Sequence, residues 1–248
     1  MDDRVAIVTG GGSGIGAAIA ALLSEKGLTV ALVGRRAEQL AEVAAELGGG
    51  IPVPADLSAP DAPASIVEQV LERTGRLDVI VNNAAAFRLM PVGEVPLEEF
   101  DQHVAVNIRA PFLLVQEALP ALRRSPAACV VNISSAAAVM FRPGQAVYAL
   151  TKAALEHLTK QLASELAPSR IRVNGIRPGP TDTPIHRAVE NPEERLRRLG
   201  VMTPLGRVGR PEEIARWVWH LVDREAEWVT GAVIPVDGGR ILGPPEGI

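Results

Sequence analysis

The sequence predicts an α/β fold: a Rossmann-type, doubly wound parallel sheet of seven strands flanked by helices. Short runs rich in valine, isoleucine and leucine alternate with longer segments whose apolar residues recur at helical spacing. Several short runs are apolar on consecutive residues, which is typical of strands covered on both faces. Repeated alternation of strand and helix gives right-handed crossovers and one doubly wound sheet.

The elements can be assigned in chain order. The expected strands are residues 4–9, 29–33, 51–54, 77–82, 128–134, 171–176 and 232–236. The expected helices are residues 16–27, 37–48, 63–75, about 98–124, 146–166 and 211–222. No repeat, low-complexity tract or linker divides the chain, so we expect residues 1–248 to form a single domain.

Composition limits the possible functions. The formal net charge is −4, basic residues form no long run and aromatic residues make up 3% of the chain, so we expect no nucleic-acid partner. The N-terminus is acidic and leads into a strand, and no segment has the apolar length of a membrane span, so we expect a cytoplasmic protein without membrane attachment. The single cysteine, Cys129, excludes a disulfide within the chain. No cluster has metal-ligand spacing, so we expect no metal.

A glycine-rich turn follows the first expected strand. Gly10, Gly14 and Gly16 fall where the strand must turn into a helix. Glycine permits positive φ and lets backbone N–H groups approach an anion, and the helix N-terminus favours a pyrophosphate. The context of strand, turn and helix is the one that a dinucleotide site needs. The alternative is a tight turn without a ligand.

The end of the second strand indicates the cofactor. Folds that prefer NAD usually place an acid there to hold the ribose hydroxyls. This chain has Gly34 at that point, followed by Arg35 and Arg36. A guanidinium contact of ~1.5–3 kcal/mol with a 2′-phosphate would favour NADP by roughly ten- to a hundredfold. We expect Arg35 to bind the phosphate, with Ser13 or Arg36 as helpers; the alternative is a solvated arginine pair.

The only tyrosine of the chain, Tyr148, lies four residues before Lys152 on a helical pattern. The two side chains share one face, and a nearby ammonium is expected to lower the pKa of the phenol. Ser135 ends the fifth expected strand, thirteen residues before Tyr148, and Asn107 interrupts a helical segment. The C-terminal ends of parallel strands are where such folds bind ligands. Taken alone, the pair favours an ordinary helix with a half-buried tyrosine and a solvent-exposed lysine; Ser135 and Asn107 reverse that ranking.

These motifs occur together and in a fixed order. They are T-G-x-x-x-G-x-G (9–16), "ADL" around Asp56, "NNAA" (82–85), Asn107, Ser135, Y-x-x-x-K (148–152), "RPGPTDT" (177–183) and "VDGG" (236–239). From Arg4 to about Gly239 the chain resembles a short-chain dehydrogenase/reductase of the single-domain, NADP-dependent kind, similar to 3-oxoacyl reductases. Ala85 and Ala138 stand where the family usually has glycine.

The resemblance implies a role for each catalytic residue. Tyr148 would be the general acid/base, and Lys152 would lower its pKa and hold the nicotinamide ribose. Ser135, rather than its neighbour Ser134, would orient the carbonyl. Asn107 would hold a water in a proton relay.

The resemblance also implies a cofactor groove. Asp56 would contact the adenine amine, Asn83 would line the groove, and Thr183 with the backbone after Gly179 would hold the carboxamide. The expected cofactor-binding residues are Gly10, Ser13, Gly14, Ile15, Gly16, Arg35, Arg36, Asp56, Leu57, Asn83, Ala84, Tyr148, Lys152, Pro178, Gly179, Thr181 and Thr183.

The implied activity is hydride transfer between NADP and a carbonyl or secondary alcohol on a small molecule, most simply NADPH-dependent ketone reduction. The segment 204–215 resembles 3-oxoacyl thioester reductases, while sugar, steroid and small-alcohol substrates stay open. Two alternatives remain: an NAD-dependent alcohol dehydrogenase, and an NADP-binding sensor or scaffold without turnover.

Residues 184–204 break the alternation and, by the resemblance, would form a lid over the substrate. Its four arginines could meet an acidic substrate, although a solvated helix face is the preferred interpretation. His186 could touch substrate, whereas His103, His157 and His220 are expected to be structural or on the surface.

Assembly is indicated by Trp217 and Trp219, which point to different sides of a helix. At least one of them is therefore expected to meet a partner subunit. The last strand would be a sheet edge that needs cover. A homotetramer fits both points.

Overall fold

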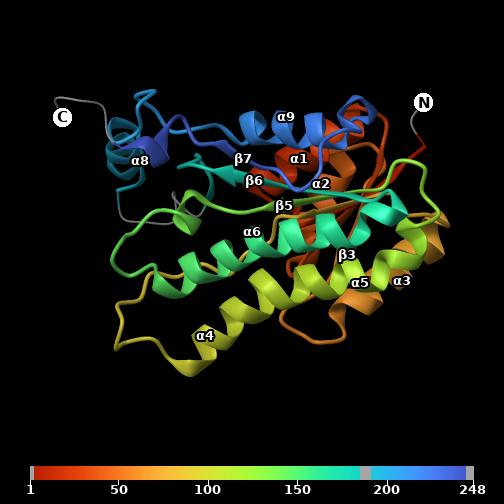
Figure 1. The fold of residues 1–248 in the computed structure, drawn as a ribbon, viewed down its shortest axis with the longest axis horizontal. Helices are drawn as coiled ribbons and strands as arrows, with labels where there is room; N and C mark the ends of the chain where they lie inside the picture. Colours follow the sequence, from red (N-terminus) through yellow and green to blue (C-terminus); the bar gives the residue numbers. More distant parts are fainter. Residues whose placement is uncertain (1–2, 185–190, 244–248) are drawn as a thin grey trace.

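The computed structural model describes residues 3–184 and 191–243, which contain one seven-stranded sheet in the order β3-β2-β1-β4-β5-β6-β7 (Figure 1). All six neighbouring pairs are parallel. The strands are β1 (Val5–Thr9), β2 (Thr29–Gly34), β3 (Ile51–Pro54), β4 (Val79–Asn82), β5 (Cys129–Ile133), β6 (Arg172–Pro178) and β7 (Val233–Val236). The predicted fold class and strand positions are confirmed.

Helices cover both faces of this sheet, as Figure 1 shows. On one face lie α1 (Gly14–Glu25), α2 (Ala37–Glu46) and α9 (Pro211–Val222). On the other lie α3 (Ala62–Thr74), α5 (Ala110–Leu122) and α6 (Ala146–Leu166). The helix α4 (Leu97–Val104) packs beside α6, whereas α8 (Pro192–Val201) lies at the upper left of Figure 1.

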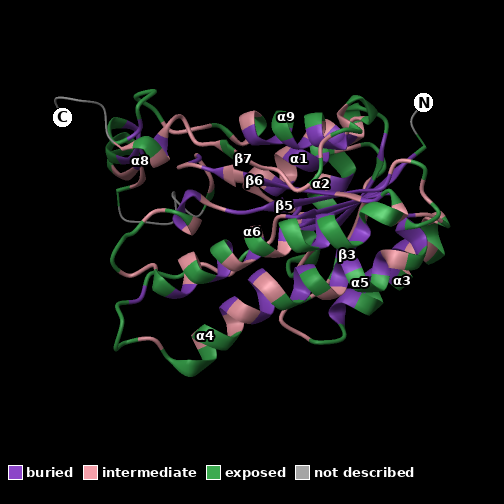
Figure 2. Cartoon of the chain, in the orientation of Figure 1, coloured by how far each residue is buried: buried purple, intermediate pink, exposed green. Residues whose placement is uncertain are grey.

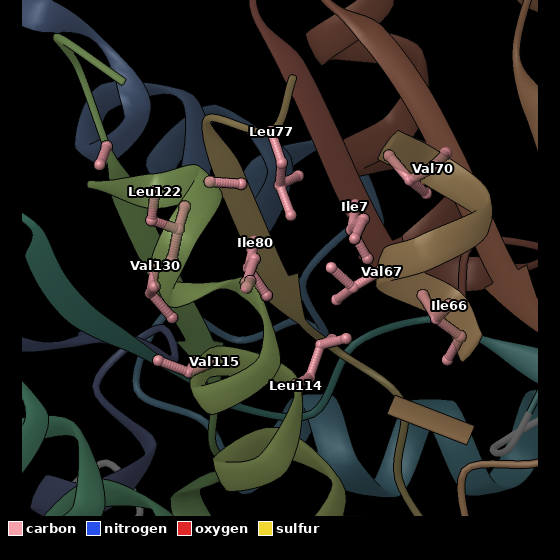
Figure 3. Packing of buried hydrophobic residues seen from close by; sticks show 14 of the residues in the cluster. Ile7, Ile66, Val67, Val70, Leu77, Ile80, Leu114, Val115, Leu122 and Val130 are labelled. Carbon is pink, nitrogen blue, oxygen red and sulfur yellow. The ribbon is translucent and has the colours of Figure 1, made fainter. Parts of the chain in front are cut away.

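Two apolar cores hold these layers together, and Figure 2 shows the strands as the most continuously buried part of the chain. Alternate strand residues point into opposite cores: Ile7 and Ile80 into one, Val8 and Val81 into the other. Figure 3 shows the first core, where strand side chains meet those of α3 and α5. Its labelled residues are Ile7, Ile66, Val67, Val70, Leu77, Ile80, Leu114, Val115, Leu122 and Val130.

One expected helix is divided. The segment predicted as a helix over about 98–124 forms α4, a π-helical turn (Ala105–Arg109) and α5. The turn contains Asn107, which the sequence marks as an interruption, and Pro111 has no N–H to bond the Asn107 carbonyl at the usual α-helical spacing. Such π turns are frequent at functional sites.

The parallel arrangement gathers the C-terminal strand ends at one side of the molecule, on the left in Figure 1. The sheet order reverses between β1 and β4, which is where doubly wound sheets leave a crevice for a ligand. In residues 3–184 and 191–243, no helix combines the length and apolar character needed to cross a bilayer.

Candidate active site

A cleft of about 930 Å³ runs along these strand ends. Its floor at β1 is the glycine turn, where Gly10 and Gly14 adopt φ of 67° and 54°. A Cβ on Gly16 would lie 2.1 Å from the carbonyl oxygen of Gly10, so only glycine lets the turn pack against α1. Ser13 precedes α1 without capping it through its side chain, which leaves first-turn N–H groups available to an anion.

Hydrogen bonds join the ends of β1 and β4. The hydroxyl oxygen of Thr9 accepts from the backbone N–H groups of Asn83 and Ala84 at 2.9 and 3.0 Å. The amide Nδ2 of Asn83 donates to the Thr9 carbonyl at 2.9 Å. The Asn83 side chain therefore fixes the shape of the groove that its residue lines.

The end of β2 is positively charged. The exposed side chains of Arg35 and Arg36 line the cleft directly after Gly34. Across the cleft, Asp56 Oδ1 accepts from the backbone and hydroxyl of Ser58 at 2.9 and 2.8 Å. These two bonds, with a smaller contribution from Arg35, hold the pKa of Asp56 below its ordinary value. The site thus offers guanidinium groups and one ionised carboxylate.

The tyrosine lies at the other end of the cleft. Tyr148 occupies the first turn of α6 and is hydrogen-bonded to Ser135, which follows β5. The ring of Phe87 packs edge-on against the ring of Tyr148, with 4.9 Å between the two ring centroids. Lys152 is 1% exposed. Its Nζ lies 5.8 Å from the centroid of the Tyr148 ring and donates a hydrogen bond to the carbonyl oxygen of Ile133 at 2.9 Å. Tyr148, Ser135 and Lys152, which the sequence predicts as catalytic residues, therefore lie close together in the folded chain.

The electrostatics differ from the expectation in one respect. Burial raises the pKa of Tyr148, and the hydrogen bond with Ser135 only partly opposes it. Burial also lowers the pKa of Lys152 to about 8. The expectation that Lys152 lowers the pKa of Tyr148 is wrong for the protein alone, because desolvation of both groups dominates.

The neighbouring serines have different surroundings. The Ser134 hydroxyl donates to Glu156 Oε1 at 2.8 Å, and Glu156 in turn receives two hydrogen bonds from Arg177 at 2.7 and 2.6 Å. Ser135 instead contacts Tyr148 and receives the backbone N–H of Ala137 at 3.2 Å. The structure therefore brings Ser135, and not Ser134, to the tyrosine.

Asn107 lies behind the site and does not line the cleft. Its fully buried side chain donates to the Ala86 carbonyl and the Thr151 hydroxyl at 3.0 and 2.9 Å, and accepts from the Ala86 N–H at 2.8 Å. Thr151 in turn donates to the Tyr148 carbonyl at 2.8 Å. Asn107 thus ties the loop after β4 to the helix that carries the tyrosine.

The segment after β6 closes the cleft between its two ends. Thr181 is buried and its hydroxyl donates to the Gly179 carbonyl at 3.1 Å. A Cβ on Gly179 would meet Asp237 at 2.7 Å, and the Thr183 methyl lies beside Gly14. Of the expected cofactor residues, only Gly16 is absent from the lining, which includes Ile15, Leu57, Ala84 and Pro178.

Comparisons with known proteins agree with this geometry. Residues 10–240 match a family model described as enoyl-(acyl carrier protein) reductase. A Pseudomonas aeruginosa relative, named rhamnolipids biosynthesis 3-oxoacyl-(acyl-carrier-protein) reductase, is 37% identical over 244 residues, which cover 95% of each chain. A solved short-chain dehydrogenase/reductase from Serratia marcescens has TM-score 0.88 and 37% identity, over 96% of this chain and 98% of that one. The chain belongs to the short-chain dehydrogenase/reductase family. The solved P. aeruginosa RhlG/NADP active-site complex has TM-score 0.90 and 36% identity, over 96% of each chain.

Several residues that line the cleft of this short-chain dehydrogenase/reductase are not evident from the sequence. They include Arg142, Arg240 and His103. His103 is buried, its Nδ1 lies 2.7 Å from the Glu99 carbonyl oxygen, and its Nε2 has no partner in the described chain. No motif marks these residues, because distant loops bring them together only when the sheet forms.

The other histidines follow the expectation where they are described. His157 and His220 are exposed on α6 and α9, whereas His186 lies outside the described residues. Within residues 3–184 and 191–243, no three His, Cys, Asp or Glu side chains are grouped as they would be around a metal ion.

The segment that the resemblance implies as a lid contains α8, whose faces differ. Arg197 donates to both carboxylate oxygens of Glu194 at 2.8 Å, and Arg198 is exposed. Arg195 and Leu199 line the cleft instead. The preferred interpretation of a solvated arginine face holds for Arg197 and Arg198 and is wrong for Arg195, while the fourth arginine, Arg187, lies outside the described residues.

The two tryptophans of α9 point apart as predicted. Trp219 packs against the second core, with Lys26 Nζ 5.8 Å from its ring centroid. Trp217 is 43% exposed on the other side.

Proposed function

We propose that the protein is an NADP(H)-dependent oxidoreductase that transfers a hydride between the nicotinamide and a carbonyl or secondary alcohol, working as an NADPH-dependent ketone reductase. The observation that carries the proposal is the placement of Tyr148, Ser135 and Lys152 in the same cleft as the glycine turn. One end can hold a dinucleotide, while the other can exchange a proton with a substrate oxygen.

The residues at the nucleotide end fit NADP. Backbone N–H groups at the start of α1 suit a pyrophosphate, and Arg35 and Arg36 can pair with a 2′-phosphate. Gly34, at the end of β2, presents no carboxylate to repel that phosphate. The NADP complex of the similar P. aeruginosa protein supports the same choice. When bound, the nicotinamide supplies or accepts the hydride.

The chain itself handles the proton and the positioning. Tyr148 gives its phenolic proton to the carbonyl oxygen in reduction and recovers it in oxidation. Its raised pKa keeps the phenol protonated near neutral pH, which supports reduction. Ser135 donates to the same oxygen and orients it, and Lys152 holds the ribose hydroxyls. Because the Asn107 side chain is fully occupied, its part in a proton relay would fall to its backbone carbonyl.

The test is Tyr148→Phe, which removes one hydroxyl and keeps the ring beside Phe87. We expect NADPH-dependent reduction of a panel of ketones to fall by about 10²–10⁴-fold while NADPH binding is retained. Phe87→Leu is the matched control, because it changes the ring contact and leaves the hydroxyl in place. Unchanged turnover in Tyr148→Phe would contradict the assignment of Tyr148 as the catalytic acid. NADPH binding by the wild type without reduction of any ketone would favour the alternative of an NADP-binding sensor or scaffold without turnover.

We further propose a homotetramer. The strand β7 pairs with β6 alone in the described sheet, and Trp217, Trp228 and Leu242 near it are exposed to 43%, 98% and 84%. Apolar side chains at a sheet edge of this kind suit a second copy of the chain. Sedimentation equilibrium of the wild type and Trp228→Ser tests it. A monomeric wild type would contradict the proposal. The cytoplasmic location stays a prediction.

A further inference from the structure

The end of the cleft beyond Tyr148 is lined by basic side chains from separate parts of the chain. Arg142 comes from the loop before α6, Arg195 from α8, and Arg240 from the short helix after β7. The carboxylate that lines this end, Glu99, is ion-paired with Arg88. Positive charge therefore exceeds negative charge where the substrate must lie.

Arg240 is the least solvated of these groups. It is 4% exposed, and its guanidinium donates to the carbonyl oxygen of Met202 and contacts the Met202 sulfur at 3.9 Å. Neither Arg240 nor Arg142 has a carboxylate partner among the described residues. Buried arginines are almost always paired, because an uncompensated charge is costly to bury.

Another largely buried arginine of the chain shows how such a charge is usually compensated, by pairing with a carboxylate. Arg177 is also largely buried, and it forms a bidentate pair with Glu156 that raises its pKa. For Arg240, burial and the neighbouring charge of Arg142 lower the pKa. Two neighbouring like charges, of which the one on Arg240 is buried, are stabilised when a ligand brings the opposite charge.

We propose that Arg142 and Arg240, with Arg195 from the lid helix, form a subsite for an oxoanion, so that the natural substrate is a carbonyl compound carrying a carboxylate or a phosphate. This inference rests on the proposed function, because the oxoanion would orient the carbonyl toward Tyr148 and Ser135. The planar guanidinium group can form paired hydrogen bonds with a carboxylate or with a phosphate. The proposal therefore assigns an oxoanion, and the experiment decides which of the two it is.

The probes are keto compounds matched in length and differing in charge. The first pair is 4-oxopentanoate and its methyl ester, and the series is extended to 3-oxobutanoate and 5-oxohexanoate with their esters. Dihydroxyacetone phosphate and dihydroxyacetone form the phosphate pair. For each probe, NADPH consumption gives kcat and KM, and calorimetric titration of the NADP-saturated protein gives a dissociation constant that needs no turnover.

The variants separate the subsite from general charge effects. Arg142→Gln removes an exposed cleft arginine on a loop, and Arg240→Lys keeps the buried charge while losing the fork. Arg197→Gln is the matched control: it removes one charge from the same lid, at a side chain that is paired with Glu194 outside the cleft lining.

We expect the anionic member of at least one pair to bind about ten- to a hundredfold more tightly than its neutral partner. Arg142→Gln should remove most of that difference, while Arg197→Gln leaves it unchanged. A preference for carboxylate or for phosphate would identify the source. Equal binding of charged and neutral probes, or a preference that survives Arg142→Gln and Arg240→Lys, would overturn the subsite.

The outcome also distinguishes the two proposals. If neutral ketones are reduced as well as their acids, the ketone reductase stands and the oxoanion subsite falls. If the acids bind with the predicted dependence on Arg142 but no probe consumes NADPH, the subsite stands and the ketone reductase loses support.

Discussion

The two ends of the cleft are stabilised in different ways. At the nucleotide end, polar groups bond to protein neighbours: Thr9 and Asn83 bond to each other, and Asp56 bonds to the residue two positions on. At the substrate end, Arg142 and Arg240 lie near each other without a carboxylate partner in the described chain. The residues that shape the nucleotide end are bonded to one another, whereas the buried charge of Arg240 at the substrate end has no carboxylate partner among the described residues.

This difference suits the two tasks. A site whose supporting polar groups are bonded to one another is held in one shape and accepts the same cofactor in every cycle. A site with buried, unpaired groups penalises every ligand that fails to pair them, and this penalty is a strong source of selectivity. The shape of the nucleotide end and the charge of the substrate end are therefore the properties that substitutions should test.

The largest effect is expected from crowding the nucleotide end. In Gly16→Ala the new Cβ would meet the backbone oxygen of Gly10, which cannot rotate away. Overpacking of this kind should lower the free energy of unfolding by about 3 kcal/mol. Gly34→Ala, where the added Cβ would lie 3.5 Å from Leu40, is the control in the same cleft. Urea denaturation measures both, and equal losses would show that the contact at Gly16 is not the cause.

The nucleotide end of the cleft can be predicted from the sequence more fully than the substrate end. The nucleotide end consists of short motifs at strand ends, so Gly10, Arg35 and Asp56 could be placed once the strands were known. The substrate end depends on which loops the closed sheet brings together. Arg142 and Arg240 are about a hundred residues apart in the sequence and belong to no motif, so no local pattern links them.

The sequence predicts which residue lies near Tyr148, but it does not predict the direction in which the pKa of Tyr148 shifts. Spacing brings Lys152 onto the same helix face, but the degree of burial is a property of the packed molecule. That burial acts on both groups, and it is the largest cause of both pKa shifts in the protein alone.

The next largest effect is expected on stability, from removing the buried charge of Lys152, which lies between the two ends of the cleft. Burial lowers its pKa from 10.5 to about 8, a difference of about 2.5 units, which corresponds to about 3 kcal/mol at ~1.36 kcal/mol per unit. Lys152→Met removes this penalty and loses one hydrogen bond worth about 1 kcal/mol, so it should stabilise the cofactor-free protein by about 2 kcal/mol at pH 7.

The pH dependence of that gain has a definite sign. Between pH 8 and 10.5 the unfolded lysine binds more protons than the folded one, so wild-type stability rises through this window and the advantage of Lys152→Met shrinks. Urea denaturation at pH 7 and pH 10 measures the change, with the exposed Lys160→Met as the control. A stability difference that is the same at both pH values would contradict the assignment.

Charge at the nucleotide end should affect cofactor choice alone. Arg35→Ala should weaken NADPH binding by about ten- to a hundredfold and leave NADH binding unchanged, because only the phosphate contact is lost. Arg216→Ala, at an exposed arginine of α9 away from the cleft lining, controls for net charge. Paired titrations followed by tryptophan fluorescence measure both cofactors. Equal or tighter NADH binding by the wild type would favour an NAD-dependent alcohol dehydrogenase.

The smallest expected shift tests the link between the serine and the tyrosine. The hydrogen bond from Ser135 lowers the pKa of Tyr148 against the effect of burial, so Ser135→Ala should raise that pKa further. The phenolate acts as base in alcohol oxidation, so the limb on the acid side of the profile, where kcat/KM in that direction falls as Tyr148 is protonated, should move to higher pH. Ser134→Ala disturbs the bond to Glu156 instead and should leave the limb in place. Ser135→Thr retains a hydroxyl and should restore the limb. A shift in Ser134→Ala and none in Ser135→Ala would reverse the assignment, because the proton-exchanging tyrosine would then be coupled through the buried Glu156 pair rather than through its direct neighbour.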